Sequence, residues 1–547
     1  MEVCPIPNLR YVHRPATRGV RRGAQKRVAL VLDTGSKNPA TLRLVSVPQL
    51  LADAAVRFGD APFLTTAAAP ISFRAAAGAV SRAAGAMVER GVRPGERVVL
   101  SAENGPGTVL AWLAAIHAGA IPAAINPALT GPEVAYVLDD LQPRLALVDA
   151  KSAAGAPGTA AAARAIAVAD IGTLDGGPAI PPHAVNPSDA AAIVYTSGTT
   201  SRPKGALVRH LAYVGAGQSV PAWIGLGPAE RIWSILPFFH INAQAYSLMT
   251  ALANGYPLTI SEKFRASTFW RDAAALGVTE VNVIGAMLAI LARQPQEMFV
   301  PGSLRLVYAA PALEPAENRR FEERFGVRIA SGFGMSENVF GCIESPTSRA
   351  KASCIGRPRQ HPAGFIHNEL RIVTPAGEVA EIGTVGELQF RNAAVTPGYW
   401  NAPEITARTL RDGWLHTGDA GYLDADGDVV LVARYKEMIR RRGENVAPGE
   451  VEDVLLLHPG VQQAAVVGVP SSLTEEDVVA AVVRRAPSDV DGEELRAWCA
   501  ARLAPFKVPS RFVFLDAFPL TPTMRVAKDR LKAEIAPLLA NGAAHGP

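Results

Sequence analysis

Apolar and polar positions along the first part of the chain follow two periods in turn, one helical and one extended. Because helices and buried strands that alternate along a chain are typical of parallel βαβ units, we expect an α/β body here. A composition rich in Ala, Gly and Pro indicates irregular surface structure over residues 153–187. The expected elements are helices over 75–90 and 108–118 and strands over 97–100, 121–125 and 190–194.

Two later regions have different patterns. Short apolar runs separated by tight-turn signals predict a β-rich subdomain with hairpins over residues 365–435. Beyond it we expect a small α+β domain of about a hundred residues, which is a usual domain size. The turn signals are Ala376-Gly377, Asp412-Gly413 and Asp426-Gly427, and the last domain should hold helices over 448–458 and 492–503 and strands over 461–469, 477–485 and 511–515.

The predicted fold class is therefore α/β, with a large N-terminal body of parallel-sheet subdomains, a β-rich subdomain and a small mobile α+β C-terminal lid. We place the boundaries at 1–44 for a basic extension, 45–435 for the N-terminal domain and 436–547 for the lid. The acidic run 424–428 is expected to be a hairpin turn. It is not a calcium loop, because Val and Tyr stand where such a loop needs Gly and Glu.

Composition and charge exclude several classes of protein. The chain has 547 residues, of which 49% are hydrophobic, so it is too long for one core and should form two or more domains. No apolar run approaches the ~18 residues of a membrane-spanning helix. The net charge of +4 originates in residues 1–32, which hold seven basic residues and one acidic residue. The rest of the chain is nearly neutral, so nucleic-acid binding by the body has no support.

The ends and the cysteines indicate where the protein works. The basic extension lacks an apolar core before a small-residue cleavage site, so we expect a disordered extension or an early start codon in place of a targeting segment. Cys4, Cys342, Cys354 and Cys499 have no metal-ligand spacing and are too few for a disulfide scaffold. We therefore expect a cytoplasmic protein. Its oligomeric state stays open.

A loop with the chemistry of a phosphate site follows the expected strand 190–194. Five hydroxyl side chains lie in the six positions 196–201, beside Gly198, where the absence of a side chain lets the backbone approach an anion. Lys204 adds a mobile positive charge. This lysine lies between Pro and Gly, whereas a Walker A loop ends in Gly-Lys-Ser/Thr. A polar surface turn is the alternative, but so many hydroxyls with one lysine behind a buried strand favour a polyphosphate site.

This loop resembles the phosphate loop of the AMP-forming adenylating superfamily, which comprises acyl-CoA synthetases, peptide-synthetase adenylation domains and luciferases. Further segments similar to the family's motifs follow in the family's order, so the resemblance covers roughly residues 45–535. The stretches 236–244 and 331–340 look most like the carnitine and crotonobetaine CoA ligase branch. The further segments are Gly332 to Glu337, Trp414 to Asp419, Arg434 to Ile439 and Arg442 to Val446.

The resemblance implies that ATP and Mg²⁺ bind across these segments. Lys204 and the hydroxyl loop would bind the β and γ phosphates, and Glu337 would hold Mg²⁺, which prefers oxygen ligands. Asp419 would accept both ribose hydroxyls, Arg434 would donate to the same sugar, and Phe333 would pack on adenine. The implied ATP-binding set is Thr196, Ser197, Gly198, Thr199, Thr200, Lys204, Ala309, Ala310, Pro311, Phe333, Gly334, Met335, Ser336, Asp419 and Arg434.

Three positions depart from the family pattern. Phe333 and Ser336 replace Tyr and Thr but keep the ring and the hydroxyl. Met524-Arg525 stands where the family has Gly-Lys, and that lysine bridges the carboxylate and the α-phosphate during adenylation. Arg525 keeps a permanent charge, but a planar guanidinium is not interchangeable with an ammonium. Either Arg525 takes over the bridge, or the acid or its geometry differs, or Lys528 takes the place by a local shift.

The lid and the acid pocket complete the implied site. The lid would rotate about Lys436 after adenylation. Gly443 and Glu444 would then lie near the pantetheine tunnel of coenzyme A, and Arg441 would meet its phosphates unless the arginines there form only a solvated face. The acid pocket would be compact and partly polar. Its residues would be His240 at the tunnel mouth, Asn242, Asn282, Gly285, Ala286 and Gly332.

We therefore predict a cytoplasmic ATP-dependent, AMP-forming ligase that adenylates a small or aromatic acid and transfers the acyl group to coenzyme A. The predicted catalytic residues are Lys204, Glu337, His240 and Arg525. The alternative is an adenylating enzyme of secondary metabolism with another acceptor, such as an amine or a carrier thiol. In one form of this alternative the enzyme activates nitrite with ATP, and the activated nitrite diazotises an arylamine. A non-catalytic nucleotide-binding protein is disfavoured, because binding alone would not require the whole metal and phosphate set.

Overall fold

The computed structural model describes residues 43–65, 69–164, 166–196, 203–310, 315–344, 351, 354–374, 376–434, 439–446, 448–471, 475–519, 526 and 528–540. The statements below concern these residues. Nearly all of the predicted extension lies outside them. Within them, every helix is too short or too polar to cross a membrane.

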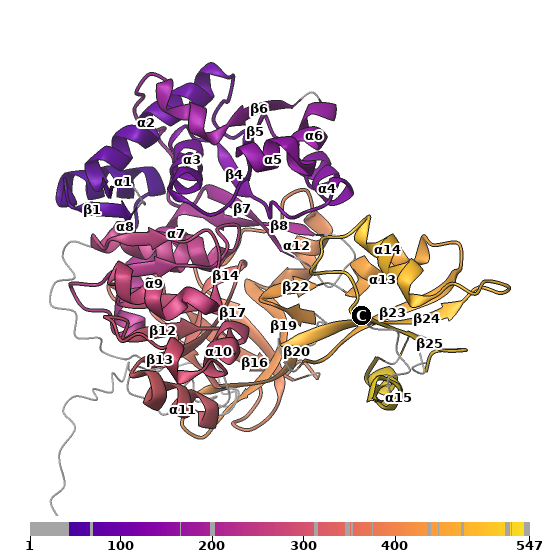
Figure 1. Ribbon diagram of the computed structural model, residues 1–547. Helices are drawn as coiled ribbons and strands as arrows, with labels where there is room; N and C mark the ends of the chain where they lie inside the picture. Colours follow the sequence, from indigo (N-terminus) through magenta and orange to yellow (C-terminus); the bar gives the residue numbers. More distant parts are fainter. Residues whose placement is uncertain are drawn as a thin grey trace, which may run out of the picture. The chain divides into compact units, whose positions relative to one another are not determined.

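The first sheet runs in the order β6-β5-β3-β4-β7-β8. All neighbouring pairs are parallel except β7 and β8, which are antiparallel. Parallel neighbours need crossover connections, and the helices of this region supply them (Figure 1). The strands are β3 (Arg97–Ser101), β4 (Ile121–Ala124), β5 (Leu145–Val148), β6 (Ala167–Asp170), β7 (Ala190–Thr196) and β8 (Lys204–Arg209), and the helices are α2 (Phe73–Glu89), α3 (Pro106–His117), α4 (Gly131–Leu141), α5 (Ala150–Ala154) and α6 (Ala156–Ala163).

The elements expected in this region are confirmed except over residues 153–187. The first half of that stretch is regular: it holds α6, β6 and a 3₁₀ helix over Ile171–Gly176. Alanine is the best helix former, and Pro157 falls in the first turn of α6, where it is tolerated. The prediction of irregular structure was therefore wrong there, because composition was weighed above helix propensity.

The second sheet changes character along its length. From β1 to β13 neighbouring strands are parallel, while from β13 to β16 they are antiparallel. The β-rich subdomain predicted over 365–435 is confirmed. Glycines at all three predicted turns, Gly377, Gly413 and Gly427, have positive φ, as such turns require.

The order of this sheet is β16-β17-β19-β20-β15-β14-β13-β12-β11-β9-β10-β1-β2, with β18 beside β19. The strands are β1 (Pro62–Thr65), β2 (Ile71–Ser72), β9 (Ile232–Ser234), β10 (Leu258–Ile260), β11 (Glu280–Val283), β12 (Leu306–Ala309), β13 (Arg328–Met335), β14 (Asn338–Ile343), β15 (Cys354–Pro358), β16 (Glu369–Val373), β17 (Gly386–Arg391), β18 (Leu410–Arg411), β19 (Trp414–Leu423) and β20 (Val429–Arg434). The associated helices are α1 (Val47–Phe58), α7 (His210–Ile224), a π-helix (Ala243–Leu248), α8 (Met249–Asn254), a 3₁₀ helix (Ala266–Thr268), α9 (Phe269–Leu276), α10 (Gly285–Ala292), a 3₁₀ helix (Gln296–Met298), α11 (Pro315–Phe325) and α12 (Pro403–Thr409).

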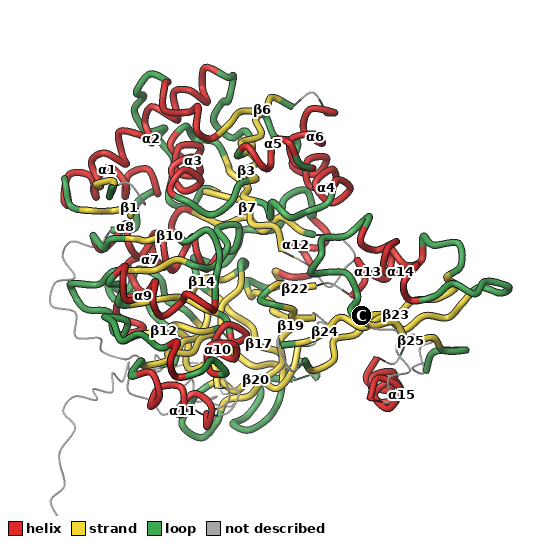
Figure 2. Tube along the Cα trace, in the orientation of Figure 1, coloured by secondary structure: helices red, strands yellow, loops and turns green. Residues whose placement is uncertain are grey.

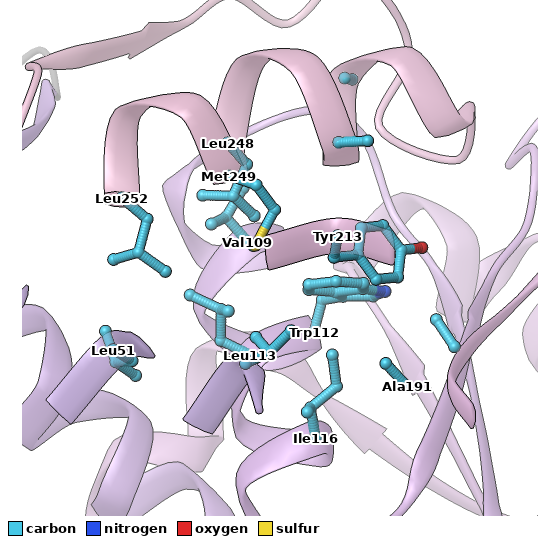
Figure 3. Close-up of a cluster of buried hydrophobic side chains, with 14 of the residues drawn as sticks. Leu51, Val109, Trp112, Leu113, Ile116, Ala191, Tyr213, Leu248, Met249 and Leu252 are labelled. Atoms are coloured by element: carbon cyan, nitrogen blue, oxygen red, sulfur yellow. The ribbon is translucent and has the colours of Figure 1, made fainter. Parts of the chain in front are cut away.

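One hydrophobic core links the two sheets. It draws on β3 and β7 of the first sheet and on β12 of the second, with α1, α3, α7 and α8 between them. Figure 3 shows its centre, where the rings of Trp112 and Tyr213 meet edge to face with centroids 5.3 Å apart. Because this core is shared, the ends of both sheets are held in fixed positions around the cavity described below.

The turn between β19 and β20 contains the acidic run 424–428, which the sequence predicts to be a hairpin turn and not a calcium loop. Lys351 places its ammonium 2.7 Å from Asp424, 2.8 Å from Asp426 and 2.7 Å from Asp428. These hydrogen bonds raise the pKa of Lys351. The Lys351 ammonium thus lies among the three carboxylates of the acidic turn, and the predicted hairpin is confirmed.

The C-terminal region forms the predicted α+β domain. β23 (Val461–Pro470), β24 (Glu476–Arg484) and β25 (Arg511–Phe514) make its sheet, with α13 (Pro448–Leu456), α14 (Gly492–Ala500) and α15 (Lys528–Ala540). Figure 2 shows these strands and helices as a separate group of elements. A small hairpin, β21 (Ile439–Arg441) with β22 (Glu444–Val446), precedes them. Neither this hairpin nor α15 was expected from the sequence.

Candidate active site

Residues of the body and of the C-terminal region line one cavity of about 850 Å³. The carboxyl ends of β4, β7 and β13 open into it, which is where ligands bind in parallel α/β sheets. The sequence-predicted residues that line it are Thr196, Lys204, His240, Phe333, Gly334, Met335, Ser336, Glu337, Asp419 and Glu444. Thr196 and Glu444, which are 248 residues apart in the chain, thus line the same cavity.

Other predicted residues lie away from the cavity or outside the described structure. Ser197, Gly198, Thr199, Thr200, Pro311, Lys436 and Arg525 are outside the described residues. Asn242, Asn282, Gly285, Ala286, Ala309, Ala310, Gly332, Arg441 and Gly443 are absent from the lining of the cavity, and the side chain of Arg434 lies outside the described structure. Ala309 is fully buried and is the last residue of β12. The predicted ATP-binding segment Ala309 to Pro311 therefore begins at the carboxyl end of this strand.

Lys204, Glu337 and Tyr399 lie together at the end of the cavity where the sequence predicts phosphate binding, called the phosphate end below. Glu337 is 6% exposed, and its Oε1 accepts a hydrogen bond of 2.6 Å from the Tyr399 hydroxyl. Burial and the charge of Glu337 together raise the pKa of Tyr399, so this phenol stays a donor. The Lys204 ammonium lies 5.9 Å from the centre of the Tyr399 ring. One carboxylate and one ammonium therefore flank the same tyrosine, at the end of β7.

A turn in β19 fixes Asp419. Gly418 has φ +68°, and its amide donates to Glu387 Oε1 at 3.0 Å. The Thr417 hydroxyl donates to the carbonyl of Leu388 and accepts from the Asp419 amide at 3.0 Å. Asp419 is 5% exposed and pairs in register with Arg434 of β20. The register agrees with the prediction that these two residues serve one ligand group.

Glu387 and His416 support this turn, and sequence reasoning gave neither a role. Burial alone would raise the pKa of Glu387, but hydrogen bonds from Gln389, His416 and Gly418 lower it. The His416 Nδ1 lies 2.8 Å from Glu387 Oε2. Both residues line the cavity. His416 stands in the recognised segment beside Asp419, whereas Glu387 comes from another strand and had no local signal.

The hairpin β21–β22 closes the cavity from the side of the lid. Glu444 Oε2 lies 3.1 Å from His240 Nε2. Burial favours neutral imidazole, but the charge and hydrogen bond of Glu444 outweigh it and raise the pKa of His240. Gly443 has φ +80°, and a Cβ there would lie 2.0 Å from Ile284 Cδ1. This close approach requires glycine.

The arginines of the hairpin divide between two environments. Arg441 Nη1 donates to the carbonyls of Phe506 and Val508, at 3.2 and 2.6 Å. Arg440 lines the cavity instead. Lys507, also in the lining, places its ammonium 2.8 Å from Glu133 of α4 and 2.7 Å from Glu450 of α13. No motif pointed to Lys507, because its partners lie far away in the chain.

The adenine side is formed by the end of β13. Phe333 is 8% exposed and lies nearly parallel to Phe390, with ring centroids 6.2 Å apart. Gly334 and Met335 follow it along the cavity wall. A flat aromatic and small neighbours here can accept a planar base. The cavity thus brings together the aromatic ring, the carboxylates and the ammonium group that the sequence predicts to bind a nucleotide.

Comparison with known proteins agrees with this geometry. The sequence model of the AMP-binding enzymes matches residues 51–400, and that of the AMP-binding enzyme C-terminal domain matches 450–525. Sulfoacetate–CoA ligase of Cupriavidus necator is 33% identical over 502 residues, which cover 88% of this chain and 96% of that protein. Crotonobetaine/carnitine–CoA ligase of Salmonella paratyphi A is 31% identical, over 83% of this chain and 91% of that protein.

Among solved structures, the amide bond synthetase McbA from Marinactinospora thermotolerans is similar in fold. Its TM-score is 0.81 at 27% identity, and the match covers 89% of this chain and 99% of McbA. The fold and cavity define a nucleotide-dependent acid ligase that forms AMP. The chain belongs to the family of AMP-binding enzymes. The resemblance found in the motifs is thereby confirmed.

Proposed function

We propose that this enzyme adenylates a small acid with ATP and then transfers the acyl group to coenzyme A. The observation that carries the proposal is the convergence of Lys204, Glu337, Asp419 and the His240–Glu444 pair on one cavity. The named activities of the sulfoacetate and crotonobetaine/carnitine ligases support coenzyme A as the acceptor.

The first half-reaction needs positive charge and alignment more than acids and bases. A carboxylate oxygen attacks the α-phosphorus in line while pyrophosphate leaves. Lys204, with the hydroxyl of Thr196, would neutralise the departing phosphates. Glu337 suits Mg²⁺, because this ion is usually held by one or two carboxylates together with phosphate oxygens. Tyr399 holds one oxygen of that carboxylate, and a bound Mg²⁺ would supply charge neutralisation between the phosphates.

Asp419 and Phe333 would orient the nucleoside. The Asp419 carboxylate can accept two hydrogen bonds from adjacent ribose hydroxyls. Its turn is held by Glu387 and Thr417, so its position is set before the ligand binds. Phe333 would contact the base. These interactions would fix the α-phosphorus relative to the acid. Such positioning contributes much of the rate of a reaction between two bound substrates.

The second half-reaction would take place beside His240 and Glu444. The charge and hydrogen bond of Glu444 raise the pKa of His240 and so favour the protonated imidazole, near where a thiol acceptor would enter. Arg440, also in the lining, offers a fixed positive charge to a phosphate-bearing acceptor. Rotation about Lys436 and the role of Arg525 stay predictions from the sequence.

A second candidate acceptor is an amine. The similarity to McbA, an amide bond synthetase, favours it, since that fold serves amide formation in a structure that matches 89% of this chain. The nitrite-dependent variant, in which an arylamine is diazotised, belongs to the same alternative.

Buried free thiols at Cys342, Cys354 and Cys499 support the expectation of a reducing, cytoplasmic setting for either reaction.

Pyrophosphate release measured over a panel of small acids and nitrite tests the proposal. Each reaction is run alone, with coenzyme A, and with an amine, and products are identified by mass spectrometry. We expect acid-dependent pyrophosphate release and an acyl-CoA product. An amide or a diazonium product formed equally well without coenzyme A would establish the second candidate. Pyrophosphate release that depends on no acid would contradict both.

A further inference from the structure

We infer that Tyr308 closes the acid end of the cavity and limits the substrate to acids with few atoms beyond the carboxylate. The inference rests on the proposed function, since it concerns the acid that is adenylated. It differs from the sequence prediction, in which Asn282 and Gly332 lined the acid pocket directly.

The strand register places Tyr308 in the predicted acid pocket. On three adjacent parallel strands, Asn282 of β11 pairs with Tyr308 of β12, and Tyr308 pairs with Ala330 of β13. Residues in register on neighbouring strands project from the same face of a sheet. Tyr308 therefore projects from the face that carries Asn282, just before the carboxyl ends of these strands.

The Tyr308 ring fills the space beside Gly332. A Cβ on Gly332 would lie 2.5 Å from the Tyr308 hydroxyl oxygen and 3.0 Å from Cε2. On another side the ring meets Tyr246 of the π-helix edge to face, with centroids 5.6 Å apart. The Tyr246 hydroxyl donates to the Val339 carbonyl at 2.6 Å, so this second ring is held in place. Glycine leaves room at residue 332, and tyrosine occupies it.

The cavity ends in front of this pair of rings. Phe333, Gly334 and Met335 line it, whereas Tyr308, Asn282 and Gly332 do not. A Cβ on Gly334 would lie 3.0 Å from the Tyr246 hydroxyl, so Tyr246 stands directly behind Gly334, and the Tyr308 ring packs against Tyr246. Asn282 is 2% exposed and donates to Ser247 at 2.8 Å, which removes it from contact with an acid. We therefore expect the acid to lie between His240 and Gly334, and the base to contact Phe333.

Tyr308 is also unusual for a simple core residue. It is 2% exposed, and its hydroxyl has no hydrogen-bond partner among the described residues. A buried hydroxyl without a partner destabilises the fold by about 1–3 kcal/mol, and phenylalanine would avoid this. Packing alone thus does not account for the residue. A role at the edge of the substrate site does.

The direct test measures pyrophosphate release by Tyr308→Ala and Tyr308→Leu over acids of increasing size, from acetate through butanoate to benzoate and cinnamate. We expect the ratio of kcat/KM for cinnamate to that for acetate to rise by about 10-fold or more, because the added volume admits the larger acid. Tyr308→Phe should keep the wild-type size limit, because the ring remains. Tyr256→Ala serves as the matched control: this buried tyrosine donates to Gly227 and lies outside the cavity lining.

The outcomes separate this inference from the proposed function. A size limit unchanged in Tyr308→Ala and Tyr308→Leu, with both variants folded by circular dichroism, would overturn the role of Tyr308. A wild-type enzyme that uses cinnamate as well as acetate would do the same. Absence of acid-dependent pyrophosphate release from the wild type would instead overturn the proposed function.

A stability cycle tests the packing without any substrate. Gly332→Ala should lower Tm in the wild type, because the new methyl group meets the Tyr308 hydroxyl. In the Tyr308→Ala background the same change should lower Tm much less. Equal losses in both backgrounds would show that the two residues do not share this space, and would overturn the inference.

Discussion

The two ends of the cavity are built in different ways. The phosphate end carries Lys204, Thr196 and Glu337, charged or hydroxyl groups whose segments each have a recognisable sequence pattern. The acid end is closed by Tyr308, Tyr246 and Gly332, uncharged residues from two strands and a π-helix, of which only Gly332 lies in a recognised segment. A nucleotide must be bound by the same charged groups in every member of a family, whereas an acid must be bound in a pocket of the right volume. Charged residues can be recognised in short runs of sequence, whereas the volume of a pocket is set only when distant segments pack together.

The largest expected effect breaks the phosphate end. Lys204→Ala should lower kcat/KM for ATP by about 100-fold or more, because one transition-state cation is lost. Folding should change by less than about 1 kcal/mol, as is usual for substitutions outside the core. Steady-state pyrophosphate release and thermal unfolding measure the two quantities.

Lys263→Ala is the matched control for this change. Lys263 is exposed and does not line the cavity, so its loss should leave ATP use unchanged. Normal ATP kinetics in Lys204→Ala would show that the phosphate end has been wrongly located.

The next largest effect is expected at Asp419, the proposed contact to the ribose. Asp419→Asn should raise KM for ATP about 30-fold, equivalent to about 2 kcal/mol, because charge-assisted hydrogen bonds to the sugar are weakened. The sharper measurement is the ratio of kcat/KM for ATP to that for 2′-deoxy-ATP. This ratio should fall toward one in the variant. An unchanged ratio would place the sugar elsewhere.

Tyr399→Phe sharpens the comparison by leaving every charge at the phosphate end intact. It removes the hydrogen bond that orients Glu337, so the Mg²⁺ concentration for half-maximal rate should rise about 10-fold. KM for the acid should not change. Tyr422→Phe, on β19 and outside the cavity lining, is the control. A change in acid KM with no change in Mg²⁺ demand would separate Tyr399 from the metal.

Much of the fold followed from the sequence, because its periodicity reports local structure. The parallel units, the β-rich subdomain and, apart from the hairpin β21–β22 and α15, the order of helices and strands in the lid were predicted and are confirmed. Residues that line the common cavity could be named for a related reason: the motifs keep local order even where Glu337 and Asp419 lie far apart.

What escaped prediction depends on contacts between distant segments. Glu387 reaches Gly418 across a strand pair, and Lys507 meets Glu133 across 374 residues. Tyr308 looked like an ordinary strand residue, and only its packing on Gly332 shows that it fills the expected pocket. The helix α6 was missed because an Ala-rich run with Pro and Gly was judged by composition.

The smallest expected effect concerns His240, between the two ends. Its folded pKa is raised above the usual 6.5, so the stability gained from Glu444 is fully present below that pH and is lost as pH rises through the folded pKa. The side chain is 35% exposed, so solvent should limit the gain to about 0.5 kcal/mol. Urea unfolding from about pH 5.5 to about pH 8.5 should show the wild type approaching His240→Gln as pH rises. A difference that grows with pH would mean that burial, not Glu444, controls this imidazole.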